Sequence, residues 1–287
     1  MPDPAVLLRF SASAARYDAH AHAQRHSARD LLAWTVASLP ASWRDGGPAG
    51  AAEAGSGPAP FGGQVMRILE PGCGTGLYTR MLLDAFPAAS VVGVDISEAM
   101  TRVARRRLGD PRVRFAVADA EEITAGSYDL VTSNATFQWF LSFPRTVARM
   151  ASLLGRGGLL TFSFFGPGTY AELDAALREV SAGRGEQEGP RVAAAGFLGR
   201  DGVAEALSAV FPRWDIVERR YHQDFPTLAD LLRSIRYTGT RGGGGRRSFS
   251  PGLLGRVEET YRRRHGGIRA TYQVLLCRGQ AAGGQGG

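Results

Sequence analysis

The stretch Met66-Arg-Ile-Leu-Glu-Pro-Gly-Cys-Gly-Thr-Gly-Leu-Tyr78 decides the fold of this chain. Val65 to Leu69 is a short apolar run, which is typical of a buried strand, and it ends at Glu70. Three glycines follow at every second position: Gly72, Gly74 and Gly76. The next segment carries apolar residues at helical spacing, so the pattern predicts strand, glycine turn and helix. Such a turn lets a ligand approach backbone N–H groups closely, and a tight turn without a ligand is the alternative.

The glycine spacing differs from that of dinucleotide-binding proteins. Their fingerprint is Gly-x-Gly-x-x-Gly, and here the third glycine comes one position early, with Leu77 in its place. A second apolar run, Ser90 to Val94, ends in Asp95, which stands 19 residues after Gly76. A carboxylate at that position can bind both hydroxyls of a ribose through charge-assisted hydrogen bonds. Capping of the following helix is the alternative role for Asp95.

Two further apolar runs also end in polar residues. The run Val113 to Val117 leads into Asp119 and Ala120, and the run Tyr128 to Ser133 leads into Asn134. Ligands bind beyond the carboxyl ends of parallel strands. Four strands that each end in a polar residue therefore predict a ligand site at one edge of the sheet.

This order of motifs resembles that of the class I S-adenosylmethionine (SAM) methyltransferases over about residues 65–165. The resemblance implies an α/β, Rossmann-like fold: a mostly parallel seven-stranded sheet with helices on both faces and a helical cap. It also implies that the cofactor is SAM.

The resemblance further implies which residues bind the cofactor. The expected set is Glu70, Gly72, Gly74, Gly76, Asp95, Ile96, Met100, Asp119, Ala120 and Asn134. Glu70 would bond near the SAM amine, or is simply the acid at a strand end. Asp119 would meet the adenine amino group, or forms a turn. Ile96 and Met100 would pack on adenine, or belong to the core, and Asn134 would line the methionine end.

The charged residues exclude some chemistry and concentrate at one end of the chain. The net charge is +7, and all 34 basic residues are arginine, so lysine Schiff-base and lysine general-base mechanisms are excluded. From Arg219 onward, 13 arginines stand against four acidic residues, a net charge of +9. The last quarter of the chain therefore carries the excess of positive charge.

The cysteines and histidines argue against a disulfide framework and a metal site. Cys73 and Cys277 are the only cysteines, too few for either a framework or a zinc site, and they indicate a reducing compartment. No apolar run is long enough to span a membrane and no signal-peptide pattern is present, so a cytoplasmic location is expected. The histidines lack metal-ligand spacing with acids, and no metal is expected: His20, His22, His26, His222 and His265.

The pattern along the chain predicts six segments. They are an N-terminal helical lid (1–44), a Gly/Ala/Pro/Ser-rich flexible linker (45–64), the SAM-binding core (65–165), a helical cap with the sixth strand (166–267), the last core strand (268–278) and a disordered tail (279–287). Because of the linker, the N-terminal helices are expected to be tethered to the core rather than built into it.

Four segments narrow the resemblance to one family. They are Phe10-Ser-Ala-Ser-Ala-Ala-Arg-Tyr-Asp-Ala-His-Ala21 with Gln24, Ser133 to Trp139, Phe162 to Leu173, and Tyr261 to Leu275. Together they resemble the malonyl-acyl-carrier-protein O-methyltransferases of biotin synthesis over nearly the whole chain. The linker at 45–64 is the clear departure, because the family joins these segments more tightly.

This resemblance implies methyl transfer from SAM to the free carboxylate of a malonyl thioester, giving the methyl ester that enters biotin (pimeloyl) synthesis. A carboxylate is already ionised at neutral pH, so the reaction needs no general base. The implied partner is an acidic acyl-carrier protein that carries malonyl-phosphopantetheine, with malonyl-CoA as the alternative thioester. Neither nucleic acid nor a membrane is an expected partner.

The expected catalytic residues are Tyr17, Asn134 and Arg145. Tyr17 would close over SAM as a lid residue, or is a buried structural tyrosine, and Gln24 is a weaker lid candidate. Arg145 and Arg269 are the candidates for binding the malonyl carboxylate.

The remaining substrate-side candidates lie in two groups. Gln138 and Trp139 would wall an acyl tunnel, or belong to the core. The candidates for docking the carrier protein are exposed arginines that are otherwise solvated surface charges: Arg233, Arg236, Arg241, Arg246 and Arg247.

Two other functions fit parts of the pattern. A related SAM enzyme that acts on another small acid or on a protein side chain, including the mitochondrial assembly-factor relatives, would share the Asn134–Trp139 region, but the Tyr17-Asp18 pair argues against it. A non-catalytic arginine-rich binder of nucleic acid would need exposed aromatics among the basic residues, and the sequence has no recognisable motif of that kind.

Overall fold

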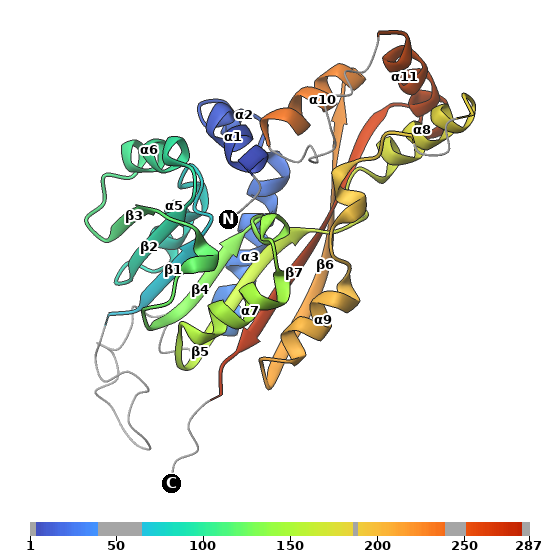
Figure 1. Ribbon diagram of the computed structural model, residues 1–287. Helices are drawn as coiled ribbons and strands as arrows, with labels where there is room; N and C mark the ends of the chain where they lie inside the picture. The colour runs from blue at the N-terminus through green and yellow to red at the C-terminus, as the bar shows by residue number, and fades with distance from the viewer. Residues whose placement is uncertain (1–3, 40–64, 186–188, 239–250, 283–287) are drawn as a thin grey trace.

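The computed structural model describes residues 4–39, 65–185, 189–238 and 251–282. In this part of the chain a seven-stranded sheet forms the centre of the molecule, with the strand order β3-β2-β1-β4-β5-β7-β6 (Figure 1). The strands are β1 (Arg67–Pro71), β2 (Ser90–Asp95), β3 (Val113–Val117), β4 (Tyr128–Asn134), β5 (Leu154–Phe165), β6 (Arg213–Phe225) and β7 (Ile268–Gln280). Strands β1 to β5 are parallel, and β7 runs antiparallel to β5 and β6. The predicted fold class is therefore confirmed.

Helices cover both faces of this sheet. They are α1 (Pro4–Ser13), α2 (Tyr17–His20), α3 (His22–Ser38), α5 (Leu77–Ala85), α6 (Glu98–Arg107), α7 (Phe143–Ser152), α8 (Ala171–Ala182), α9 (Arg200–Ser208), α10 (Leu228–Tyr237) and α11 (Pro251–His265). Short 3-10 turns are η2 (Ala120–Glu122), η3 (Phe137–Trp139) and η4 (Ala193–Gly196).

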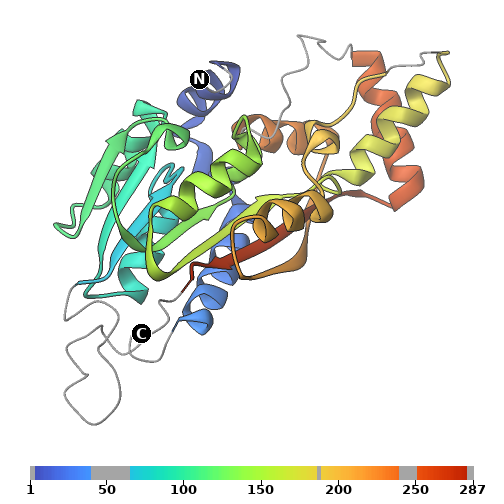
Figure 2. The same ribbon diagram turned by 60° about the horizontal axis from the view of Figure 1, so that its bottom comes forward.

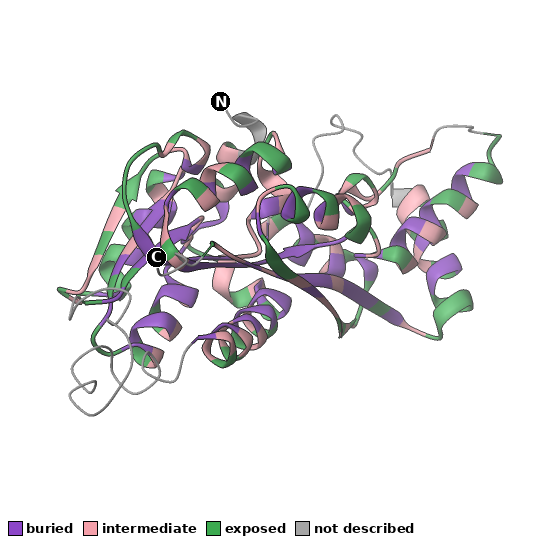
Figure 3. Cartoon of the chain, turned by 90° about the horizontal axis from the view of Figure 1, so that it is seen from below, coloured by how far each residue is buried: buried purple, intermediate pink, exposed green. Residues whose placement is uncertain are grey.

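The core consists of two apolar clusters, one on each face of the sheet. Successive side chains of a strand point to opposite faces, so Ile68 and Leu69 of β1 belong to different clusters, and both are fully buried. Ile68 packs with Leu31 of α3 and Leu82 of α5. Leu69 belongs to the cluster that includes Val147 of α7 and the buried side chains of α9. Figure 3 shows the buried strands between these two layers of helices.

Helix α3 is part of the layer that covers the sheet. Its Ser27 Oγ donates a hydrogen bond to Ser163 Oγ of β5 (2.8 Å), and Thr35 Oγ1 donates to Thr161 Oγ1 (2.9 Å). Leu31, between them, is fully buried. The expectation that the N-terminal helices are tethered rather than built in is therefore wrong for α3. The linker at 45–64 lies outside the described residues.

The ends of three strands differ from the sequence-based expectation. β1 begins at Arg67 rather than Val65, which is 55% exposed, and β5 begins at Leu154 and includes the glycine-rich run before Leu159. β7 continues to Gln280, where its backbone pairs with β5. The prediction of a disordered tail from residue 279 is thus wrong for 279 and 280. A side chain at Gly279 would collide with Phe211, so this glycine permits packing rather than disorder.

The cap stands at the carboxyl end of the parallel strands. Phe165, the last residue of β5, pairs with Val274, so the first six residues of β7 continue beyond β5 beside β6. These two long strands hold α8, α10 and α11 at their far end (Figures 1 and 2). Helices are thereby placed beside the edge of the sheet where the ligand site is predicted.

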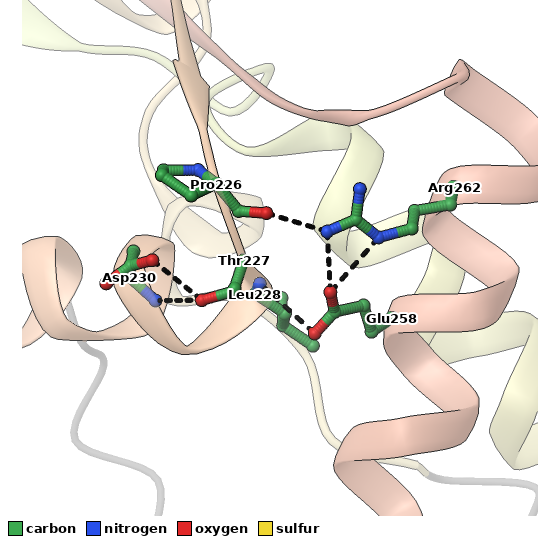
Figure 4. A network of polar contacts seen from close by, with 6 residues as sticks. All are labelled: Pro226, Thr227, Leu228, Asp230, Glu258 and Arg262. Atoms are coloured by element: carbon green, nitrogen blue, oxygen red, sulfur yellow. Dashed lines mark hydrogen bonds and ion pairs between the residues drawn. The ribbon is translucent and has the colours of Figure 1, made fainter.

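A network of polar contacts joins α10 to α11 (Figure 4). Thr227 caps α10 by accepting a hydrogen bond from the backbone N–H of Asp230 (3.2 Å). On α11, Glu258 and Arg262 form an ion pair one turn apart (2.7 Å), and Arg262 also donates to the carbonyl oxygen of Pro226 (2.7 Å). The start of α10 is therefore fixed to the side of α11.

Candidate active site

The glycine turn between β1 and α5 has the geometry of a ligand cradle. Gly72, Gly74 and Gly76 all have positive φ angles, of 70°, 53° and 76°. The turn is tied to the end of β2 by a hydrogen bond from Gly72 N to Val94 O (2.7 Å). A Cβ atom on Gly72 would lie 2.2 Å from Thr136 Oγ1, whereas one on Gly74 would meet nothing within 4 Å. Gly72 therefore packs against protein, and Gly74 borders open space.

Asp95 lies directly against this turn. One carboxylate oxygen accepts a hydrogen bond from Gly74 N (2.9 Å), and the other accepts one from Ser97 N (2.8 Å). Burial raises the pKa of Asp95, and the two hydrogen bonds oppose that rise. The N-cap of α6 is Ser97, whose hydroxyl accepts from Met100 N (3.3 Å). The carboxylate of Asp95 thus joins the glycine turn to the start of α6.

Glu70 is buried beneath the turn, with 1% of its surface exposed. Its carboxylate accepts a hydrogen bond of 2.5 Å from Thr79 Oγ1 of α5. Burial, and to a smaller extent the charge of Asp95, raise the pKa of Glu70 to about 8, against the opposing effect of the Thr79 hydrogen bond. Glu70 is therefore mostly protonated at neutral pH, which a simple strand-end acid at the surface would not be.

The residues that are predicted to contact adenine differ in their burial and in their hydrogen bonds. Asp119 accepts a hydrogen bond from Glu121 N (3.0 Å), so its carboxylate forms the turn that begins η2. Met100 and Ala120 are buried, with 2% and 6% exposed surface. Ile96 is half-buried beside Asp95 and is the more accessible of the two apolar candidates. The structure thus supports the turn role of Asp119 and a core position for Met100.

Asn134 is held between α3 and β5. Its Nδ2 donates to the carbonyl oxygen of Gln24 (3.1 Å), and its Oδ1 accepts from Ser163 Oγ (2.8 Å). Sequence reasoning did not find these partners, because they lie 110 and 29 residues away along the chain. The structure therefore brings Asn134 together with Gln24.

Two amide oxygens near this point have no hydrogen-bond partner among the described residues. They are Oε1 of Gln24, a residue with 4% exposed surface, and Oε1 of Gln138. A buried polar atom without a partner is unfavourable, and such atoms are commonly completed by a ligand. The chain therefore offers acceptors that fit the positively charged ammonium group of a bound amino-acid moiety.

Helix α2 is fixed on top of the glycine turn. Thr75 Oγ1, within the turn, donates to a carboxylate oxygen of Asp18 (2.7 Å), and Arg107 of α6 forms an ion pair with the other oxygen. Arg107 also donates to the carbonyl oxygen of Thr75 (3.1 Å). Asp18 is expected from the sequence only as part of a family signature, and no pattern predicts the contacts of Thr75 and Arg107. The position of Asp18 beside Tyr17 was the available signal.

Tyr17 and a row of aromatic rings border the turn on the N-terminal side. Burial and the negative charges of Asp18 and Asp95 raise the pKa of Tyr17, so its phenol stays neutral. Its ring lies 6.3 Å from that of Phe10, and Phe10 meets Trp139 edge-on at 5.8 Å. Trp139 is half-buried in this row rather than part of either core cluster. The ring of Phe10 thus connects Tyr17 to Trp139.

For the two arginines predicted to bind the malonyl carboxylate, the structure shows no contact with Tyr17 or Asn134 among the described residues. Arg145 is exposed on α7, on the opposite face from α3, and no described contact joins it to Tyr17 or Asn134. Arg269 already forms a two-bond ion pair with Asp224 (2.8 and 3.2 Å).

The structure places two of the five docking candidates. Arg233 and Arg236 are exposed on α10, and Arg241, Arg246 and Arg247 lie outside the described residues. The part of the chain that is described contains no group of three metal-ligating side chains. None of its helices has the length and hydrophobicity needed to cross a membrane.

Comparison with known proteins identifies similar chains. A family model described as a methyltransferase domain matches residues 68–158. The malonyl-[acyl-carrier protein] O-methyltransferase of Geobacter sulfurreducens is 34% identical over 281 residues, which cover 93% of this chain and 94% of the relative. The protein of the same name from Acetivibrio thermocellus is 30% identical, with 96% and 93% covered. The crystal structure of the YcgJ protein from Bacillus subtilis matches with a TM-score of 0.53 and 16% identity over 77% of this chain and 93% of that one, a likeness of fold alone.

Proposed function

The chain belongs to the malonyl-[acyl-carrier protein] O-methyltransferase family, and we propose on this premise that its substrate is a malonyl group carried by an acyl-carrier protein. The enzyme is a SAM-dependent methyltransferase that esterifies the free malonyl carboxylate, and the methyl ester enters biotin synthesis. The observation that carries this proposal is the extent of the similarity. It covers 93% of this chain and 94% of the Geobacter relative, far more than the methyltransferase domain at residues 68–158.

We assign the donor to the glycine turn. When bound, SAM supplies an electrophilic methyl group on a sulfonium. The open space at Gly74 leaves room for the methionine part, and Asp95 beside it is the candidate for the ribose hydroxyls. Glu70 lies below the turn, and the unpartnered Oε1 of Gln24 is an acceptor for the ammonium group. These residues fit a cofactor with a positive charge and a ribose.

The acceptor oxygen needs alignment and dehydration rather than activation. A malonyl carboxylate is ionised at neutral pH, so no residue has to remove a proton from it. Tyr17, whose raised pKa keeps it neutral, can donate a hydrogen bond without competing for that charge. The aromatic row of Phe10 and Trp139 can exclude water from the reacting groups. Positioning of two reactants is worth roughly 7–11 kcal/mol of the barrier when the geometry is right.

A comparison of two substrates tests the proposal. Purified enzyme with SAM is expected to methylate malonyl-carrier protein and to leave acetyl-carrier protein unmodified, because the acetyl group has no free carboxylate. The measurement is the mass of the carrier protein together with release of S-adenosylhomocysteine. Equal turnover of the two thioesters would rule out carboxylate methylation.

We also place the enzyme in the cytoplasm, because Cys73 and Cys277 are both buried free thiols.

A further inference from the structure

A cluster of basic side chains lies where the lid helix α2 meets the cap helix α10. Arg16, which precedes α2, donates a hydrogen bond to the hydroxyl of Tyr237 (2.7 Å), and its guanidinium carbon stands 5.6 Å from the centre of that ring. The ring of His20 stacks on the same tyrosine, with centroids 4.7 Å apart and planes at 21°. Both ends of α2 are thereby fixed to one residue of α10.

A third basic side chain belongs to the same place. Arg233 stands four residues before Tyr237, so the two side chains share one face of α10, and Arg233 is exposed. Burial, followed by the charges of His22, Arg233 and Arg16, lowers the pKa of His20. His22, two residues after His20, begins α3, and Arg233 stands one helical turn from Tyr237, which both Arg16 and His20 contact. We call Arg16, His20, His22 and Arg233 the junction cluster.

The junction cluster has more positive than negative charge. Among the described contacts, the acid paired with this cluster is Asp230, which forms an ion pair with Arg233 (2.6 Å). Asp18, on the same short helix as His20, is bound to Thr75 and Arg107 instead. Positive side chains that repel one another at a partly exposed site are stabilised when an anion binds between them. The cluster therefore fits a small, doubly or singly charged anion.

The position of the cluster indicates which anion this is. Helix α2 has four residues, and it presents Asp18 to the glycine turn and His20 to α10. The junction cluster therefore lies at the rim of the donor site, between the lid and the cap. A malonyl group that reaches the donor site on a phosphopantetheine arm brings one phosphodiester with it, at the other end of the arm. Arginine is well suited to bind phosphate oxygens in pairs.

We propose that the junction cluster binds the phosphodiester of the phosphopantetheine arm that carries the malonyl group. This inference rests on the proposed function, because it takes the arm as the substrate carrier. Binding of the phosphate would also hold α2 against α10, and so would keep the lid closed while the substrate is present. The cluster then recognises the arm itself, whichever carboxylate stands at its end.

A substrate pair that differs only in the phosphate tests the proposal. The two substrates are malonyl-phosphopantetheine and malonyl-pantetheine, and the variant is the double substitution Arg16→Gln with Arg233→Gln. The expected result is that kcat/KM for the phosphate-bearing substrate falls at least tenfold more than kcat/KM for the phosphate-free one. An equal loss on both substrates would overturn the proposal. If the unmodified enzyme methylates neither substrate, the proposed function fails instead.

The matched control removes two arginines from the opposite end of the sheet. Arg156 and Arg213 are both exposed, and they stand near the amino ends of β5 and β6. The double variant Arg156→Gln with Arg213→Gln is expected to treat the two substrates as the unmodified enzyme does. If it reproduces the selective loss, the effect is one of overall charge and the junction cluster is not the site.

A measurement without turnover gives a second result. The pKa of His20 is followed by NMR titration, with His20→Gln to assign the signal. The expected result is a higher pKa of His20 in the presence of phosphopantetheine, and no change with pantetheine, because a bound phosphate stabilises the imidazolium. An identical pKa with both compounds would overturn the proposal. The proposal would also be overturned if a short RNA raised the pKa of His20 and phosphopantetheine did not.

Discussion

Asp18 and Thr75 are joined by a hydrogen bond of 2.7 Å across 57 residues of sequence. The second carboxylate oxygen of Asp18 binds Arg107, so one side chain connects α2, the glycine turn and α6. The ion pair between Asp18 and Arg107 is partly exposed, with 23% and 35% of the side chains accessible, and its own contribution to stability is modest. The ion pair is important because it fixes α2 on the glycine turn, where we place SAM.

The first prediction concerns this connection. Asp18→Asn and Arg107→Gln are each expected to weaken SAM binding by roughly tenfold, about 1.4 kcal/mol, because the glycine turn loses its outer support. The double variant should be little worse than either single one, since both remove the same connection. Calorimetry gives the affinities. The exposed pair Glu98 and Arg102 on α6 supplies the control: Arg102→Gln should bind SAM as the unmodified protein does. Fully additive losses would contradict the prediction.

The glycines of the turn should respond differently to the same substitution. Gly74→Ala places its Cβ in open space, so we expect a loss of stability of only about 1–2 kcal/mol from the positive φ angle, but a large loss of SAM binding. Gly72→Ala would in addition push into Thr136, and should lower the melting temperature much further. Thermal unfolding and SAM titration separate the two effects. A Gly74→Ala protein with normal SAM affinity would remove this glycine from the donor site.

Asp95→Ala is expected to lose SAM affinity by tenfold or more, about 1.4 kcal/mol, because the ribose loses its charged acceptor. The same variant should bind methionine with little change, since that ligand has no ribose. Competition titrations with the two compounds check this. An unchanged affinity for SAM would exclude Asp95 from the donor site.

Glu70 should make stability depend on pH. Its pKa is raised from 4.5 to about 8 in the folded protein, so the folded state holds a proton that the unfolded state has released between these values. The free energy of unfolding should therefore fall as pH rises from 5 to 8, by on the order of a few kcal/mol, and level off above pH 8. Glu70→Gln should lack this decline, and the exposed Glu122→Gln should keep it. Denaturant unfolding at several pH values gives the slopes. Parallel curves for all three proteins would contradict the assignment.

The sequence was sufficient to predict the sheet and the polar residues at the ends of its strands. Strands β1, β2 and β4 are local apolar runs, and their parallel arrangement brings Glu70, Asp95 and Asn134 to one edge. The packing of α3 could not be predicted, because its contacts with the sheet include the hydroxyls of Ser27 and Thr35, whose partners lie more than a hundred residues away. Its sequence therefore looks too polar for a helix that lies on a buried sheet.

The substrate-side residues were the least predictable. Arg145 and Arg269 were named as candidates for the malonyl carboxylate, but the side of α7 or β7 that faces the site depends on packing that the sequence does not contain. Asp119 was expected to contact adenine or to form a turn, and one oxygen of its carboxylate accepts the hydrogen bond that begins η2. The link from Asp18 to Arg107 spans 89 residues, and no local pattern indicates it.

The attachment of α3 decides which part of the protein can move. Ser27 and Thr35 bind this helix to β5, and Ala21, which is neither helical nor extended, separates it from α2. We expect a hinge at Ala21, so that residues 4–20 swing as one flap. The flap is held by side-chain contacts and, among the described residues, has no strand pairing with the sheet: Ser11 contacts Ser97, Asp18 contacts Thr75 and Arg107, and Arg16 and His20 contact Tyr237. We expect spent cofactor to leave as residues 4–20 swing open while α3 stays bound to β5, so that the opening of this flap sets the speed of each catalytic cycle.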